Sequence, residues 1–208
     1  MDTFSQKMST REPVRLLALG DSYTIGESVA EVQRWPVQLI DSLKKEGYTC
    51  YPPEVIARTG WRTDELQKAI KIGDPDRNFT LVALLIGVNN QFQGKSLPEY
   101  ESQFQELLNT ALEHAGGNAE KVLVLSIPDY GFTPFGRENQ QRISREIDAF
   151  NFVNKSLAEK KGVTYINITD ISRRASDDPE LVAEDGLHPS GKMYALWVQR
   201  ILEALKQF

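Results

Sequence analysis

One serine, one histidine and one aspartate have the types and spacing of a hydrolytic site. Ser22 follows a short apolar run, and Asp185 precedes His188 by three residues. A serine hydroxyl becomes an effective nucleophile when an adjacent base takes its proton, and imidazole is the usual base near neutral pH. A carboxylate three residues before a histidine can reach its Nδ1–H, fix the tautomer and stabilise the imidazolium. Ser22, His188 and Asp185 are therefore the candidate nucleophile, base and orienting acid.

Acyl transfer also needs hydrogen-bond donors aimed at the oxygen on which negative charge develops. Gly60 offers a backbone N–H with no side chain in the way, Asn89 offers a side-chain amide, and the backbone N–H of Ser22 is a third candidate. Each residue alone has a simpler interpretation, since serine caps helices and glycine and asparagine occur in turns. The combination is what favours a catalytic interpretation.

Short apolar runs alternate with longer amphipathic stretches, which is typical of a parallel α/β sheet. The pattern predicts strands over residues 14–19, 54–57, 80–86, 121–127 and 163–168. It predicts helices over 35–46, from about 64 to 71, and over 98–114, 137–161 and 190–206, with a polar loop at 176–185. Because crossovers between parallel strands are right-handed, we expect a three-layer α/β/α sandwich. The expected sheet is flavodoxin-like, with five parallel strands in the order 2-1-3-4-5.

The candidate residues follow the predicted strands. Because the carboxyl ends of parallel strands meet at one edge of a sheet, the residues after them should lie close together. The segments concerned are residues 20–24, 58–61, 87–90 and 128–132, and residues 185–189 beyond the last strand. The second strand is poorly marked because Pro52 and Pro53 precede it, and an edge position in the sheet would tolerate these prolines.

These residues also resemble a known family. Gly-Asp-Ser at 20–22, Gly60, Gly-x-Asn at 87–89 and Asp-x-x-His at 185–188 are similar, in the same order, to the four blocks of the SGNH hydrolases, also called GDSL esterases and lipases. The resemblance implies that Ser22 is the nucleophile, His188 the base and Asp185 its orienter, with Gly60 and Asn89 completing the oxyanion hole. It further implies a metal-independent hydrolase of esters, thioesters or amides that needs no cofactor.

One position departs from the family pattern. Asn90 stands where the third block commonly has an aspartate. An amide can still form hydrogen bonds and brace a loop, so activity is expected to survive the difference. Side chains close to the blocks are expected as substrate contacts: Tyr23, Trp61, Asn90, Tyr130 and Phe132, with Phe135 a further candidate.

Composition bounds the remaining possibilities. The chain has 208 residues, of which 40% are hydrophobic and 25% charged, and its net charge is −5. This profile predicts one soluble catalytic domain over residues 13–208, after a disordered or loosely packed tail at 1–12. No basic cluster suggests nucleic acid, and no run reaches the roughly 20 apolar residues of a membrane span. With one cysteine and two histidines, neither an internal disulfide nor a metal site is expected.

The leading hypothesis is a serine esterase that removes small acyl groups from a small-molecule ester through an acyl-enzyme on Ser22. O-acetyl groups of carbohydrates are one candidate substrate, and a lysophospholipase or thioesterase is the alternative on the same site. A flavodoxin-like electron carrier would leave Gly60, Asn89, Asp185 and His188 without roles, and a non-catalytic binding module would lose nothing on Ser22→Ala. The chain as given carries no signal peptide, which predicts a cytoplasmic protein and leaves an exported mature form open. It carries no signal for an oligomeric state.

Overall fold

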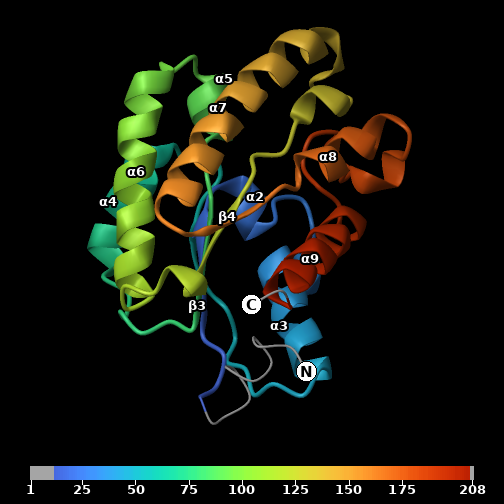
Figure 1. Cartoon of the computed structure of the whole chain (residues 1–208). Coiled ribbons are helices and arrows are strands. Elements are labelled where there is room, and N and C mark those ends of the chain that lie inside the picture. Colours follow the sequence, from blue (N-terminus) through green and yellow to red (C-terminus); the bar gives the residue numbers. More distant parts are fainter. Residues whose placement is uncertain (1–11, 207–208) are drawn as a thin grey trace.

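A five-stranded parallel sheet runs through the middle of the computed structural model, which describes residues 12–206 (Figure 1). The strands pair in the order β2-β1-β3-β4-β5, which confirms the predicted order. Their bounds are β1 Leu16–Gly20, β2 Glu54–Ala57, β3 Leu81–Leu85, β4 Val122–Leu125 and β5 Thr164–Ile166. Strand β2 has the predicted bounds, and the other four are one to three residues shorter than the apolar runs, because the ends of a run already turn into the loops.

Helices cover both faces of the sheet, which gives the predicted three layers (Figure 1). On one side α6 packs against α4 and α7, and on the other α3 packs against α9. The bounds are α3 Trp35–Lys45, α4 Thr63–Gly73, α6 Leu97–His114, α7 Gln140–Lys160 and α9 Gly191–Leu205. The shorter helices are α2 Ser22–Ile25, α5 Val88–Phe92 and α8 Thr169–Ser172, and the 3-10 turns are η1 Glu31–Gln33, η2 Ala119–Lys121, η3 Tyr130–Phe132, η4 Arg137–Asn139, η5 Arg173–Ser176 and η6 Pro179–Leu181.

Burial follows the position of each strand in the sheet. Strands β1, β3 and β4 are buried throughout, as expected for apolar strands with helices on both faces. The edge strands β2 and β5 are partly exposed, and β2 has the edge position that tolerates Pro52 and Pro53. The central pair β1 and β3 is in a register that places Gly20 beside Leu85. Two chain turns therefore leave the sheet next to each other.

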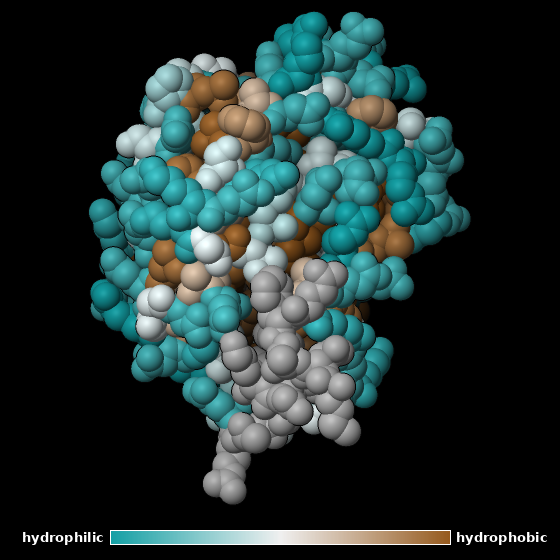
Figure 2. Space-filling view, viewed as in Figure 1, coloured by the Kyte–Doolittle hydropathy of each residue, from teal (hydrophilic) through white to brown (hydrophobic). Residues whose placement is uncertain are grey.

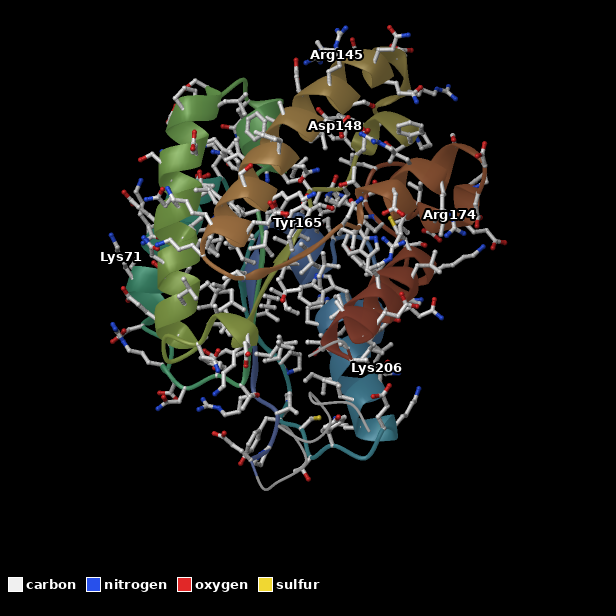
Figure 3. All side chains as sticks on the ribbon, viewed as in Figure 1. Lys71, Arg145, Asp148, Tyr165, Arg174 and Lys206 are labelled. Carbon is white, nitrogen blue, oxygen red and sulfur yellow. The ribbon has the colours of Figure 1, made fainter. Side chains whose placement is uncertain are left out.

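The outer faces of the helices are polar. Lys71, Arg145, Arg174 and Lys206 extend away from the sheet (Figure 3). The face in Figure 2 is accordingly mostly hydrophilic, with small apolar areas between the helices. Within residues 12–206, no helix is both long and apolar enough to cross a membrane.

The start of one predicted helix was wrong by three residues. The helix expected from residue 137 begins at Gln140, because Arg137–Asn139 forms the 3-10 turn η4. The polar segment at 176–185 is irregular, as predicted, and it contains the short 3-10 turn η6, where the Asp178 carboxylate accepts the N–H of Glu180 and Pro179 takes the first position. The predicted tail at 1–12 lies outside the described residues except for the exposed Glu12.

The turn after β3 yields a stability prediction. Gly87 has φ +131°, and a Cβ there would lie 2.5 Å from the Tyr100 hydroxyl and 2.7 Å from Ile127 Cδ1. Gly47 has φ +95° with open space around the same position. Both alanine variants incur a backbone cost of about 1–3 kcal/mol, but only Gly87→Ala adds overpacking of about 1–3 kcal/mol.

Urea unfolding should therefore show a larger loss of unfolding free energy for Gly87→Ala than for Gly47→Ala. Equal losses would mean that the crowding around Gly87 does not matter.

Candidate active site

The turn after β1 holds Ser22 at the carboxyl end of the sheet. A Cβ on Gly20 would lie 2.4 Å from the Leu85 carbonyl oxygen and 2.2 Å from Thr24 Oγ1, so only glycine fits where β1 ends. The Asp21 carboxylate then caps α2 by accepting the backbone N–H of Tyr23 at 3.0 Å. Ser22 is the first residue of this helix, and 5% of its surface is exposed.

Asp185 and His188 lie together in a hairpin that leads into α9. The Asp185 carboxylate contacts His188 Nδ1 at 2.6 Å, and it accepts the backbone N–H groups of His188 and Leu187 at 2.9 Å each. It also accepts the Ser28 hydroxyl at 2.6 Å. Partial burial alone would raise the pKa of Asp185, but these hydrogen bonds outweigh it and lower that pKa well below its ordinary value. An ionised carboxylate requires His188 to donate from Nδ1, which leaves Nε2 as the ring acceptor.

The residue after the serine supports the histidine. The rings of Tyr23 and His188 meet edge to face, with centroids 5.8 Å apart and an interplanar angle of 65°. Tyr23 also contacts Trp197 of α9, at 6.5 Å between centroids. The His188 ring is thus held by a carboxylate at Nδ1 and by an aromatic ring carried on the serine's own helix.

A pocket of about 150 Å³ joins the loops at this edge of the sheet. Seven predicted residues line it, namely Ser22, Tyr23, Gly60, Asn89, Tyr130, Phe135 and His188. The four others are Thr59, Val88, Phe92 and Leu187. Asp185 lies behind His188 rather than in the wall. The segments that follow the five strands therefore each contribute residues to one pocket.

The two adjacent asparagines have different surroundings. Asn89 lines the pocket, and its Nδ2 donates to the Trp61 carbonyl at 3.0 Å, which leaves one N–H of the amide for a ligand. Asn90 is buried, with Oδ1 accepting the Thr63 N–H at 3.1 Å and Nδ2 donating to the Thr63 hydroxyl at 2.7 Å. An amide at this position does brace a loop, namely the one between β2 and α4.

Three expected substrate contacts do not lie in the pocket wall. Asn90 directs its whole amide at Thr63, whereas Trp61 and Phe132 are partly buried and pack against the hydrophobic core. The structure places Val88, Phe92 and Leu187 there instead. A local signal for two of these existed, because Phe92 follows Asn89 by three residues on one helix and Leu187 is adjacent to His188.

A short segment after α2 contains two further residues that the motifs did not indicate. The Glu27 carboxylate accepts the Thr59 hydroxyl, next to Gly60, and the Ser28 hydroxyl donates to Asp185. Ser28 has φ +64°, which is unusual for a residue other than glycine. Residues 27–28 thus connect the serine's helix to the Gly60 loop and to the His188 hairpin.

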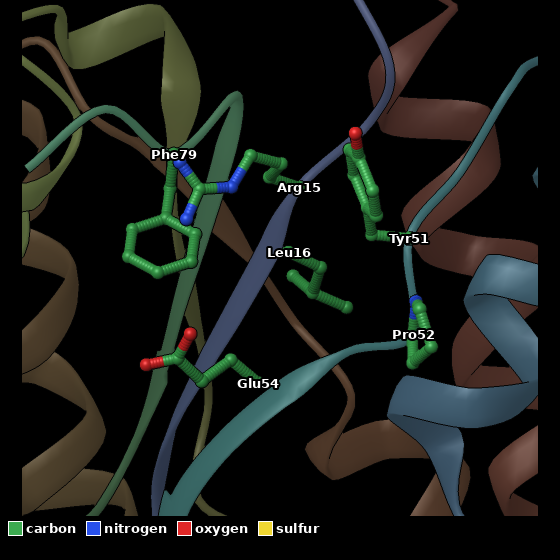
Figure 4. A pocket seen from close by; sticks show the side chains of 6 residues that line it. All are labelled: Arg15, Leu16, Tyr51, Pro52, Glu54 and Phe79. Carbon is green, nitrogen blue, oxygen red and sulfur yellow. The ribbon is translucent and has the colours of Figure 1, made fainter. Parts of the chain in front are cut away.

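A second pocket, of about 420 Å³, lies at the other end of the strands, where β1 and β2 begin (Figure 4). Its Arg15 guanidinium lies 4.8 Å from the centre of the Phe79 ring and forms an ion pair with Asp76 at 2.8 Å. None of the predicted catalytic residues lines it. Across residues 12–206, no group of three or more His, Cys, Asp or Glu side chains is arranged to hold a metal ion. The pocket beside Ser22 is therefore the candidate active site.

The chain matches the model of a known protein family. The model of the GDSL-like Lipase/Acylhydrolase family matches residues 18–196, from within β1 to within α9. The chain belongs to this family. Its fold is that of a GDSL esterase or acylhydrolase, and membership implies a hydrolase that acts on esters.

Individual relatives are distant in sequence and close in fold. YpmR of Bacillus subtilis (strain 168) is 24% identical over 225 residues, covering 98% of this chain and 86% of that protein. TesA is 19% identical with a TM-score of 0.70, covering 92% of this chain and 98% of TesA. Axe2, an acetylxylan esterase from Geobacillus stearothermophilus, is 17% identical with a TM-score of 0.70, covering 92% of this chain and 94% of Axe2. At these identities the two structures show a shared fold.

Asp21 generates a pH-dependent stability prediction. Its carboxyl is fully buried, and this burial raises its pKa from 3.8 to about 7, against the lowering effect of the Tyr23 N–H. A raised folded-state pKa contributes stability that is present below about pH 4 and lost as pH rises through about 7. Asp21→Asn keeps an acceptor for the Tyr23 N–H without the charge. Urea unfolding at pH 4, 6 and 8 should show that the unfolding free energy of the variant increases relative to that of the wild type as pH rises. A difference that does not change with pH would contradict this.

Asn90 generates a second stability prediction. Asn90→Ala leaves the buried Thr63 N–H without its partner, which should cost about 1–3 kcal/mol of unfolding free energy. Asn90→Asp keeps an acceptor for that N–H and should cost less than the alanine change. Chemical unfolding of the two variants side by side checks the order, and equal losses would mean that the brace contributes nothing.

Proposed function

We propose that this protein is a serine esterase that removes small acyl groups from uncharged esters through an acyl-enzyme on Ser22. The observation that carries the proposal is the 2.6 Å contact between Asp185 and His188, in a pocket that His188 shares with Ser22. The likeness to the acetylxylan esterase Axe2 supports acetylated carbohydrates as one class to test.

The proposed reaction begins when His188 Nε2 takes the proton from Ser22 Oγ as that oxygen attacks the ester carbonyl. Negative charge develops on the carbonyl oxygen, and the proposed donors to it are the backbone N–H groups of Ser22 and Gly60 and the amide of Asn89. The protonated imidazole then gives its proton to the departing alcohol. Water, deprotonated by the same histidine, releases the acid and restores Ser22.

The nucleophile assignment predicts the effect of one substitution. Ser22→Ala should fold like the wild type, because the Asp21 cap on α2 does not use the serine hydroxyl. Hydrolysis of p-nitrophenyl acetate should fall by at least about 10³-fold, since the acyl-enzyme has no oxygen on which to form. Wild-type turnover should persist in EDTA, because every proposed step uses only groups of the protein itself and water. Undiminished turnover by Ser22→Ala, with normal circular dichroism, would reject the mechanism.

If His188 is the base, substitutions of the two histidines should have different effects on the rate. The chain has only two histidines, and His114 lies in α6 with its Nδ1 on the Asp76 carbonyl at 2.8 Å. His188→Gln should lose most of the rate, whereas His114→Gln should keep the rate and the wild-type fall in kcat/KM towards acid pH, which reflects protonation of the base. Asp185→Asn should lose on the order of 10⁴-fold in kcat through the wrong tautomer. An unchanged pH profile in a full-rate His188→Gln enzyme would overturn the assignment.

A further inference from the structure

Two exposed phenylalanines stand at the candidate active site. Phe92 on α5 and Phe135 after η3 are 59% and 55% exposed, and both line the pocket that contains Ser22. Each ring contacts the buried Tyr130, at 6.3 and 6.2 Å between centroids, and the two lie 6.2 Å from each other. We call Phe92, Tyr130 and Phe135 the aromatic cluster. Exposed apolar groups gathered beside a pocket are typical of a ligand-binding surface.

The cluster is attached to the catalytic loops. Phe92 is on the same short helix as Asn89, and the Phe135 backbone N–H donates to the Gly186 carbonyl at 3.0 Å, two residues before His188. The positions of these rings are therefore set by the elements that carry the proposed oxyanion donor and base. A group resting on the cluster lies beside the reacting ester bond.

The chemistry of the wall indicates what that group is. Val88 and Leu187 extend the apolar surface of the cluster, and within the described residues no Lys, Arg, Asp or Glu lines the pocket. A wall of this kind offers few partners for the hydroxyls of a sugar, which lose their water on binding. The volume of about 150 Å³ equals that of an apolar cavity known to hold benzene, a six-carbon ligand.

We infer that the aromatic cluster binds an apolar chain of about six carbons, so that the preferred substrate is an uncharged aliphatic ester rather than an acetylated carbohydrate. This inference rests on the proposed esterase activity. The chain can belong to the acyl or the alcohol part of the ester, because both present the same apolar surface to the cluster.

Two isomeric esters show whether the apolar chain belongs to the acyl part or to the alcohol part of the substrate. Ethyl hexanoate carries its six-carbon chain on the acyl side and hexyl acetate carries it on the alcohol side, and ethyl acetate is the reference without the chain. Rates are measured by titrating the released acid. We expect kcat/KM for one isomer to exceed that for ethyl acetate by about 10-fold or more, because the burial of a few methylene groups is enough to produce a difference of this size. An acetylated xylo-oligosaccharide hydrolysed faster than both isomers would overturn the inference.

Variants test the role of the cluster. Phe92→Ala and Phe135→Ala should each reduce the ratio of kcat/KM between the preferred isomer and ethyl acetate by about 10-fold. The matched control is Phe152→Ala, a phenylalanine of α7 that is 72% exposed and does not line this pocket, and its ratio should stay at the wild-type value. Unchanged ratios in both cluster variants would refute the inference while leaving the esterase proposal standing. Failure of the wild type on every ester would instead refute the proposed function.

A separate observation concerns Ser28, whose hydroxyl donates to Asp185 Oδ2 at 2.6 Å, the oxygen that also contacts His188. The residue holds this contact with φ +64°, a conformation that costs a serine free energy. Backbone strain of this kind persists where the surrounding structure enforces it, and it clusters at active sites. The contact joins residues 157 positions apart in the chain.

We propose that Ser28 is a positioning residue that fixes Asp185 against His188, again on the basis of the proposed activity. Ser28→Gly removes the hydroxyl and suits the positive φ, and Ser28→Asn also tolerates that φ and keeps an N–H donor. The glycine variant should lose about 10-fold in kcat at unchanged KM, the loss expected for one hydrogen bond to a charged group. The asparagine variant should recover part of that loss.

The split between kcat and KM distinguishes positioning from a general effect on folding, because the substrate pocket does not include Ser28. Wild-type kcat in Ser28→Gly would reject the proposal. So would equal kcat values in the glycine and asparagine variants.

Discussion

The parallel pairing of β1 with β3 is the constraint on which the rest of the site depends. Their register sets Gly20 beside Leu85, and a side chain at Gly20 would collide with the Leu85 carbonyl. Each strand then turns at once into a four- or five-residue helix, α2 or α5. These two helices carry Ser22 and Asn89, so their separation follows from the hydrogen-bonded spacing of two buried strands.

Two aspartates near the site show how surroundings decide the charge of one side-chain type. Asp21 is fully buried and its side chain accepts one backbone N–H, so burial dominates and its pKa rises to about 7. Asp185 is less buried and accepts the backbone N–H groups of Leu187 and His188, the Ser28 hydroxyl and the His188 ring N–H, so its pKa falls. The ionised group is thereby placed next to the imidazole, and the group that resists ionisation is placed at the start of α2, where it caps the helix.

Much of this arrangement could be predicted because its signals are local or topological. The Asp185–His188 contact spans three residues, and the meeting of the five segments that follow the strands results from the parallel strand order. Side-chain directions in irregular segments carry no such signal, which is why Trp61 and Phe132 were expected in the pocket and instead pack on the core. Contacts between distant segments, such as Ser28 with Asp185 or Phe92 with Phe135, depend on how loops pack and leave no periodic pattern in the chain.

Asp185 and His188 share a single hairpin, closed where Val182 pairs with Pro189. The backbone hydrogen bonds inside it include Ala183 N–H to His188 O at 2.8 Å and Gly186 N–H to Ala183 O at 3.0 Å, while β3 is buried and paired along both sides. Segments with few buried contacts open locally at a lower free energy than the core of a fold. Amide protons of the hairpin should therefore exchange with solvent sooner than those of β3. On heating, Asp185 and His188 should separate from Ser22 while the sheet is still intact, so that loss of the proposed activity and unfolding have different midpoints.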